Sequence, residues 1–253
     1  MSDRIFFHRN YEHMNDHNSG IVRRDMYFCR TADVPLPEYS ALLTGFQKII
    51  NETGRRIKIH DFGNYNLGKF DYGSPDWYQE HALTKRERGL GRQVSAVVID
   101  KLLREEPFQK QKPHFDVMIV DKDLTTYLDE PENRFIFGLG PYPNNIISVK
   151  RFIHNIKDPR LRKASLAVLG AHEFGHNLDL VRRNFNIGTE GYKISHCNGE
   201  KGPCLMEQVN VDEARNIDEQ AKLIIDKDKW LCPDCTDEIQ FKRDDLRKKG
   251  VYW

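Results

Sequence analysis

The feature that most constrains this chain is a pair of histidines four residues apart inside a long stretch without proline. His172 and His176 lie in the segment 160–180, which Asp158 and Pro159 precede. An aspartate followed by a proline is typical of the first positions of a helix. Residues four apart lie on one face of a helix, so we expect both imidazole rings to face one point.

Glu173 follows the first histidine directly and completes an H-E-x-x-H arrangement. In this pattern the two imidazoles bind zinc, while the glutamate holds a water at the open zinc position and acts as its general base. Zinc lowers the pKa of that water and polarises the scissile carbonyl. The pattern therefore predicts hydrolysis of peptide bonds without a covalent intermediate.

A catalytic zinc needs a third protein ligand, and three residues after the histidine pair are candidates. They are Asp179, Glu190 and His196. Three ligands from one helix would spread along its axis, so we choose His196 as the ligand and expect Asp179 to hydrogen-bond a ligating histidine. The alternative for His196 is a surface histidine in a loop.

Four of the five cysteines lie late in the chain, as Cys197, Cys204, Cys232 and Cys235. The first residues of the chain are charged and contain no apolar stretch of a secretion signal, so we expect a cytoplasmic protein with reduced thiols. Clustered cysteines in such a chain typically bind metal. Four thiolates predict a closed, structural zinc site. A redox pair of Cys232 and Cys235 is the alternative, and it leaves the other two cysteines unexplained.

The charge balance and the apolar runs limit the class of partner. Lys and Arg total 39 and Asp and Glu total 38, so no net field attracts nucleic acid or an anionic membrane. No apolar run approaches the roughly 20 residues that span a bilayer. We expect a peptide or protein substrate, no nucleic acid and no membrane.

The remaining apolar patterns predict an α/β or α+β fold. Helices are expected at 37–51 and 94–103, and strands at 57–60, 115–120, 134–138 and 146–149. A long loop is expected at 61–77, the first thirty residues show no clear period, and Cys29 is expected to be a small buried apolar residue.

A single domain over residues 1–253 is the simplest partition. Within it, 1–34 is an unassigned N-terminal segment, and 35–180 carries the sheet and the helices through the active-site helix. Residues 181–253 carry the third ligand and the cysteine site.

These motifs together resemble the archaemetzincins, whose pattern is H-E-x-x-H-x-x-G-x-x-H-C, then C-x-M, then C-x-x-C. The likeness extends over about 115–235. The matching residues are His172, Glu173, His176, His196, Cys197, Cys204, Met206, Cys232 and Cys235.

The resemblance implies a metzincin-like zincin domain with a twisted mixed sheet, an active-site helix and a C-terminal segment bound to zinc by four cysteines. It also implies a catalytic zinc on His172, His176 and His196, with Met206 in a turn beneath that zinc. The chain would thus hold two zinc ions. Its substrate cleft would follow an edge strand supplied by 135–138.

The chain departs from the family pattern between the second and third histidines. Asp179 stands at the position of the family glycine, and Arg182 stands at the position of the third histidine. Nineteen residues separate His176 from His196 where the pattern has five, so fourteen are extra. We expect the chain to turn near Gly188 or Gly191 and then present His196.

Two other functions are compatible with these motifs. One is a zinc-binding interaction module on a peptidase scaffold that does not catalyse. The other is a metal-dependent hydrolase of a non-peptide amide. Glu173 favours catalysis, because a site that only binds needs no base beside its ligand.

Overall fold

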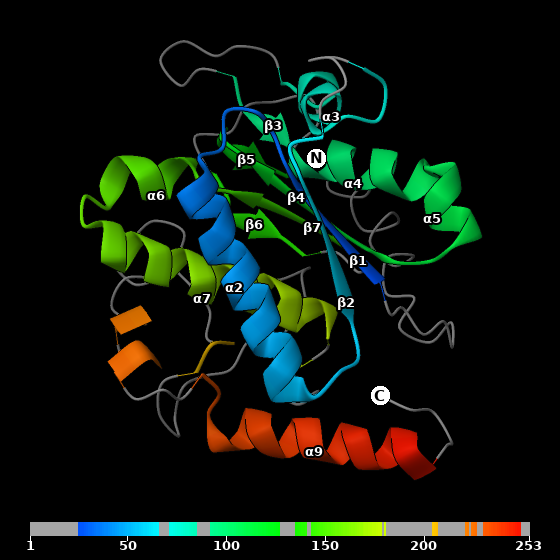
Figure 1. The fold of residues 1–253 in the computed structure, drawn as a ribbon, viewed down its shortest axis with the longest axis vertical. Coiled ribbons are helices and arrows are strands. Elements are labelled where there is room, and N and C mark those ends of the chain that lie inside the picture. Colours follow the sequence, from blue (N-terminus) through cyan, green and yellow to red (C-terminus); the bar gives the residue numbers. More distant parts are fainter. Residues whose placement is uncertain are drawn as a thin grey trace, which may run out of the picture.

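The computed structural model describes residues 25–65, 71–84, 92–126, 135–140, 143–178, 180, 204–206, 221–222, 224–226 and 230–248. Its larger sheet has five strands in the order β2-β1-β4-β7-β6 (Figure 1). Their bounds are β1 Asp25–Arg30, β2 Lys58–Gly63, β4 Phe115–Val120, β6 Gly138–Leu139 and β7 Asn144–Ser148. β2, β1, β4 and β7 run parallel, and β6 pairs with β7 in the antiparallel direction. The predicted mixed α/β architecture is confirmed, with a mostly parallel sheet.

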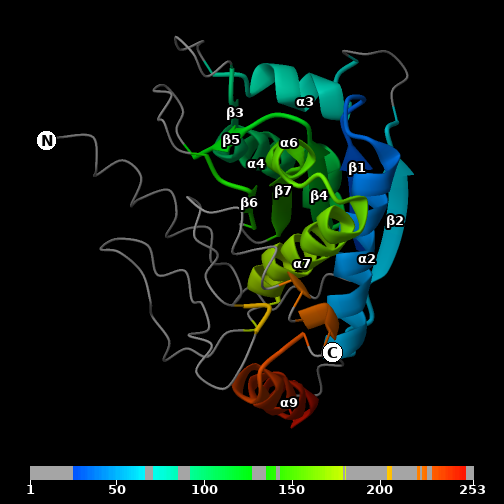
Figure 2. The same cartoon turned by 90° about the vertical axis from the view of Figure 1, so that its left-hand side faces the viewer.

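A smaller parallel sheet lies beside the first, and helices surround both. It consists of β3 Val94–Ser95 and β5 Leu124–Thr125. The helices are α2 Leu36–Thr53, α3 Pro75–His81, α4 Ala96–Glu105, α5 Pro107–Gln111, α6 Lys150–Asn155, α7 Pro159–Asn177 and α9 Pro233–Lys248. In Figures 1 and 2, α9 lies at the bottom, on the far side of α7 from the sheet.

Helices cover both faces of the larger sheet. This arrangement explains why the sequence of β4 is almost entirely apolar. Val117 and Ile119 belong to the core that contains α2 and α7. Met118 and Val120 point the other way, into a second core built on α4. Successive side chains of a strand point to opposite faces, so a strand between two helix layers needs apolar residues at every position.

The helix that carries His172 and His176 forms where its sequence predicts it. The Asp158 carboxylate accepts hydrogen bonds from the N–H groups of Arg160 and Leu161, and Pro159 occupies the first turn. These contacts satisfy amides that have no partner within the helix. α7 ends at Asn177, three residues before the expected end at Leu180.

Three expectations about the first hundred residues differ from the structure. The unassigned segment 25–30 is strand β1, which lies between β2 and β4. The expected loop 61–77 begins as the end of β2 and finishes in α3, whose first turn is capped by the Ser74 side chain. Cys29 is half-buried rather than buried, and its thiol donates a hydrogen bond to the carbonyl of Val117 at 3.5 Å.

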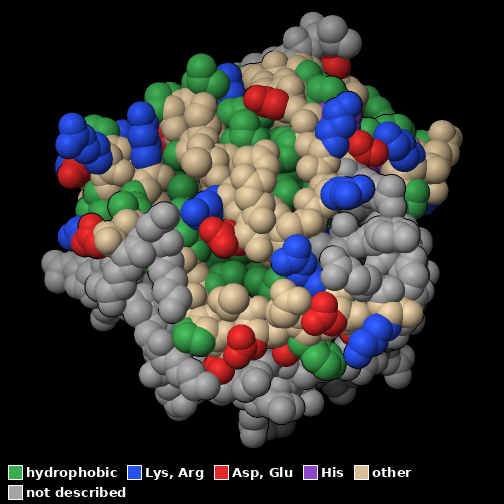
Figure 3. Space-filling model, turned by 60° about the horizontal axis from the view of Figure 1, so that its bottom comes forward, with side chains coloured by type: hydrophobic (Ala, Val, Ile, Leu, Met, Phe, Trp, Pro, Cys, Tyr) green, Lys and Arg blue, Asp and Glu red, His purple; other side chains and the backbone are tan. Residues whose placement is uncertain are grey.

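The surface drawn in Figure 3 has mixed charge. Lys and Arg side chains are interspersed with Asp and Glu side chains on this face, as the balanced composition leads one to expect. None of the helices within the described ranges has the length and apolar character needed to cross a membrane.

Candidate active site

The two histidines of the H-E-x-x-H segment converge near the C-terminal end of α7. His172 Nε2 and His176 Nε2 are 3.1 Å apart, and their ring planes meet at 88°. Two nitrogens bound to a tetrahedral zinc at about 2.0–2.1 Å lie roughly 3.3 Å apart. The separation of the two Nε2 atoms therefore fits a shared zinc ion.

A backbone carbonyl determines which nitrogen of His172 is available. Its Nδ1 lies 2.6 Å from the carbonyl oxygen of Leu205. A carbonyl can only accept, so Nδ1 carries the proton and Nε2 keeps its lone pair. His172 is buried, and burial lowers the pKa of its imidazole although the Leu205 carbonyl acts in the opposite direction. The neutral ring with Nε2 unprotonated is the form that binds a metal ion.

Glu173 lies beneath β6, which is the last strand of the larger sheet among the described strands. Its side chain is 8% exposed, and burial raises the pKa of its carboxyl to about 8. A Cβ at Gly138 would lie 2.7 Å from both Cδ and Oε1 of Glu173. The glycine therefore lets β6 approach this carboxyl closely, and a cation bound beside it would lower the pKa again.

The segment 204–206 connects the histidine pair to a group of cysteines. Cys204, Leu205 and Met206 are fully buried. The Leu205 N–H donates to the carbonyl of Trp230 at 2.7 Å, which fixes the peptide that faces His172. The Met206 sulfur packs against Gly175, where a Cβ would overlap it. Met206 thus lies against the helical turn between Glu173 and His176.

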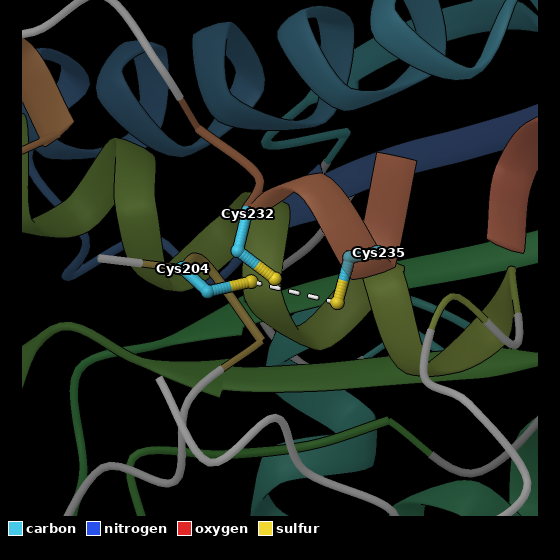
Figure 4. Close-up of side chains that lie close together, drawn as sticks. All are labelled: Cys204, Cys232 and Cys235. Carbon is cyan, nitrogen blue, oxygen red and sulfur yellow. Dashed lines mark hydrogen bonds between the residues drawn. The ribbon is translucent and has the colours of Figure 1, made fainter. Parts of the chain in front are cut away.

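Three cysteines form a buried group beside this segment (Figure 4). The sulfur atoms of Cys204, Cys232 and Cys235 all lie within 4.8 Å of one another. The Cys204 thiol donates to Cys235 Sγ at 3.6 Å. Two thiolates bound to a tetrahedral zinc at about 2.3 Å lie roughly 3.8 Å apart, so these sulfur atoms fit a metal site. Cys232 precedes α9 and Cys235 lies in its first turn.

Several predicted site residues lie outside the residues that the structure describes. They are Asp179, Arg182, Glu190, His196 and Cys197. His196 as the third zinc ligand, Cys197 as the fourth thiolate and Asp179 as a hydrogen-bond partner therefore stay predictions. The described residues bring together two of the three histidines and three of the four cysteines.

Two features of this site did not follow from the sequence motifs. Gly138 allows the contact between β6 and Glu173, and the buried side chain of Asn177 follows His176 directly. A glycine at a strand end and an asparagine at a helix end are common for local reasons. Neither residue carried a signal that distinguished it from those cases.

Comparisons with known proteins support the fold. No protein family model matches the chain, and no curated protein matches it. Among solved structures, an archaemetzincin from Methanopyrus kandleri matches with a TM-score of 0.52 and 19% identity. The match covers 86% of this chain and 94% of the other. At this identity the likeness concerns the fold alone, and it shows that the chain has the fold of an archaemetzincin.

Proposed function

We propose that this chain is a zinc-dependent peptidase of the archaemetzincin type. One observation carries the proposal: two histidine Nε2 atoms meet at 3.1 Å beside a buried glutamate on the same helix. Two metal-ligating imidazoles with an adjacent carboxylate are the elements of zinc-assisted hydrolysis.

The proposed catalytic zinc would be held by His172, His176 and His196. When bound, it supplies a Lewis acid and a water of lowered pKa. Glu173 orients the attacking water, takes its proton and passes that proton to the leaving amine. The Leu205 carbonyl keeps the His172 ring in the tautomer that binds metal.

A second, structural zinc is proposed on the cysteines. Cys204, Cys232 and Cys235 would hold it with Cys197 as the fourth ligand. Four thiolates leave no open coordination position, so this ion would link the segment 204–206 to the start of α9 and would not take part in the reaction.

The proposed substrate is an extended peptide that lies beside β6. This strand is the last in its sheet among the described strands, and Glu173 lies directly against it. A peptide in extended form can add to such an edge through main-chain hydrogen bonds. Its carbonyl groups would then pass close to the Glu173 carboxyl.

The test replaces Glu173 with glutamine and measures hydrolysis of a peptide library together with zinc content. We expect Glu173→Gln to keep its zinc and to lose about 10²–10⁴-fold in rate, because a positioned general base contributes that much. Glu52→Gln is the matched control, since Glu52 lies on α2 in an exposed ion pair with Lys48. Wild-type rates in Glu173→Gln would exclude Glu173 as the base.

Elemental analysis separates the two zinc sites. The wild type is expected to hold two zinc ions, and His196→Ala and Cys235→Ala are each expected to remove a different one. A wild type that binds zinc but cleaves no peptide would instead support the interaction module.

A further inference from the structure

Asn177 is the last residue of α7 and lies in a cluster of buried amide groups. Its side chain is 1% exposed. Its Nδ2 donates to Asn145 Oδ1 at 3.0 Å, to the Asn144 carbonyl at 3.3 Å and to the Gly140 carbonyl at 3.4 Å. Two amide protons are thus shared among three acceptors, which come from β7 and from the residue that follows β6.

The orientation of the Asn177 amide follows from its neighbours. Two of its three partners are backbone carbonyls, which can only accept, so the atom that faces them is the nitrogen. Asn177 Oδ1 and Asn145 Nδ2 then have no partner among the described residues, although both atoms are fully buried. Buried polar atoms without partners lower stability. The three bonds that Asn177 Nδ2 makes nevertheless tie the end of α7 to β7 and to Gly140.

The cluster lies where β6 meets the helical turn that carries Glu173. A Cβ at Gly138 would lie 2.7 Å from the Glu173 carboxyl carbon, and a Cβ at Gly140 would lie 2.7 Å from the Glu173 carbonyl oxygen. The first residue of β6 and the residue that follows the strand therefore both lie directly on this turn. The Asn177 side chain holds the end of the strand at Gly140 and reaches back to β7.

We infer that Asn177 is a positioning residue that holds the edge strand β6 at a set distance from Glu173. This inference rests on the proposed function, because it concerns the peptide that lies along β6. The position of a peptide paired with β6 depends on the position of that strand. A shift of the strand therefore moves the scissile bond away from the base. A misplacement of about 1 Å can lower an enzymatic rate by about 10²-fold.

The first experiment needs no activity and measures amide hydrogen exchange in the full chain. The variants are Asn177→Ala and the isosteric Asn177→Asp, which keeps the side-chain volume but replaces the donor by a carboxyl oxygen. The reporter amides are those of the β6–β7 pair, including the Ser148 N–H that donates to Phe137. The internal reference is the β1–β4 pair. Gln109→Ala is the control for loss of a buried amide, because Gln109 bonds His114 and Asp116 at the start of β4.

In both Asn177 variants we expect exchange of the β6–β7 amides to rise about tenfold relative to the β1–β4 amides, because the strand loses its attachment to α7. Gln109→Ala should not raise this ratio, because its hydrogen bonds support the start of β4, which belongs to the reference pair. An equal rise at both pairs, or no rise at β6–β7, would overturn the inference, because Asn177 would then contribute only to global stability or to nothing measurable.

The second experiment applies once the wild type is shown to cleave peptides. With zinc content unchanged, Asn177→Ala is expected to lower kcat/KM by about 10²-fold for peptides long enough to pair with β6. Dipeptide-sized substrates should be affected less. Equal losses for both lengths would overturn the positioning role. An inactive wild type would contradict the proposed function. The exchange experiment alone would then test whether Asn177 holds β6 in place.

Discussion

A methyl group added at Gly138 should damage the site more than the fold. In Gly138→Ala the new Cβ would lie 2.7 Å from Cδ and Oε1 of Glu173 and 2.8 Å from its Cγ. Nonbonded carbon atoms prefer about 3.5–4.0 Å, so either β6 or the carboxyl must move by about 1 Å. Overpacking of this kind costs about 1–3 kcal/mol of stability, and a 1 Å shift at a reacting group costs about 10²-fold in rate.

The assay compares kcat/KM for peptide hydrolysis, zinc content and urea unfolding in two variants. Gly170→Ala is the matched control, because its Cβ would lie 2.9 Å from the Leu42 carbonyl oxygen and 3.1 Å from the Phe46 ring. It overpacks the same helix against α2 and leaves β6 untouched. We expect similar losses of stability, with a large loss of kcat/KM in Gly138→Ala alone. Equal effects on kcat/KM would refute the idea that β6 sets the position of Glu173.

Two further predictions concern the cysteine group and a surface ion pair. Cys235→Ser should loosen the segment that holds the Leu205 carbonyl against His172. In a chelator titration we expect the zinc affinity of the histidine pair to fall about 10–100-fold. An unchanged affinity would show that the cysteine group does not support the histidine site. The Lys112 ammonium donates a hydrogen bond to Asp25 and lowers the pKa of that carboxyl below 3.8. The stabilisation of the folded state by this ion pair is therefore fully present above pH 3.8, the ordinary pKa of the carboxyl, and is lost as the pH falls through the lowered pKa. In urea unfolding, Asp25→Asn should cost more stability near neutral pH than in acid, and a cost independent of pH would contradict the pair's contribution.

Elements with a local signal could be predicted from the sequence. The α7 helix has a capping Asp158 and a long stretch without proline, and β4 has a short continuous apolar run. The convergence of His172 and His176 also follows from local geometry, because residues four apart share a helix face whatever the helix packs against.

Elements that depend on distant partners could not be predicted. β1 reads Asp-Met-Tyr-Phe-Cys-Arg, and only Met26 and Phe28 are buried, so its alternation is short and ends in charged residues. It is a strand because β2 and β4 pair with it on both sides. The strand expected at 134–138 is shorter and lies later, at Gly138–Leu139, because its position is set by pairing with β7 and by the glycine contact with Glu173.

The link between the two proposed metal sites shows the same limit. The sequence identifies Cys204 and Met206 as side chains with possible roles, but it says nothing of the residue between them. Leu205 acts through its backbone carbonyl, and any residue at that position would offer one. Only the folded chain reveals that this carbonyl faces His172.

The likeness to an archaemetzincin and the local chemistry carry different parts of the proposal. At 19% identity, a shared fold places a helix and an edge strand side by side but does not say what chemistry occurs between them. The chain itself supplies the chemistry, with a histidine held in its metal-binding tautomer and a carboxylate buried against the last strand of the sheet. Because these groups lie at the junction of α7 and β6, each residue that sets the spacing of this junction is expected to affect activity more than stability. Gly138 and Asn177 are the two positions where that expectation differs most clearly from the behaviour of an ordinary core residue.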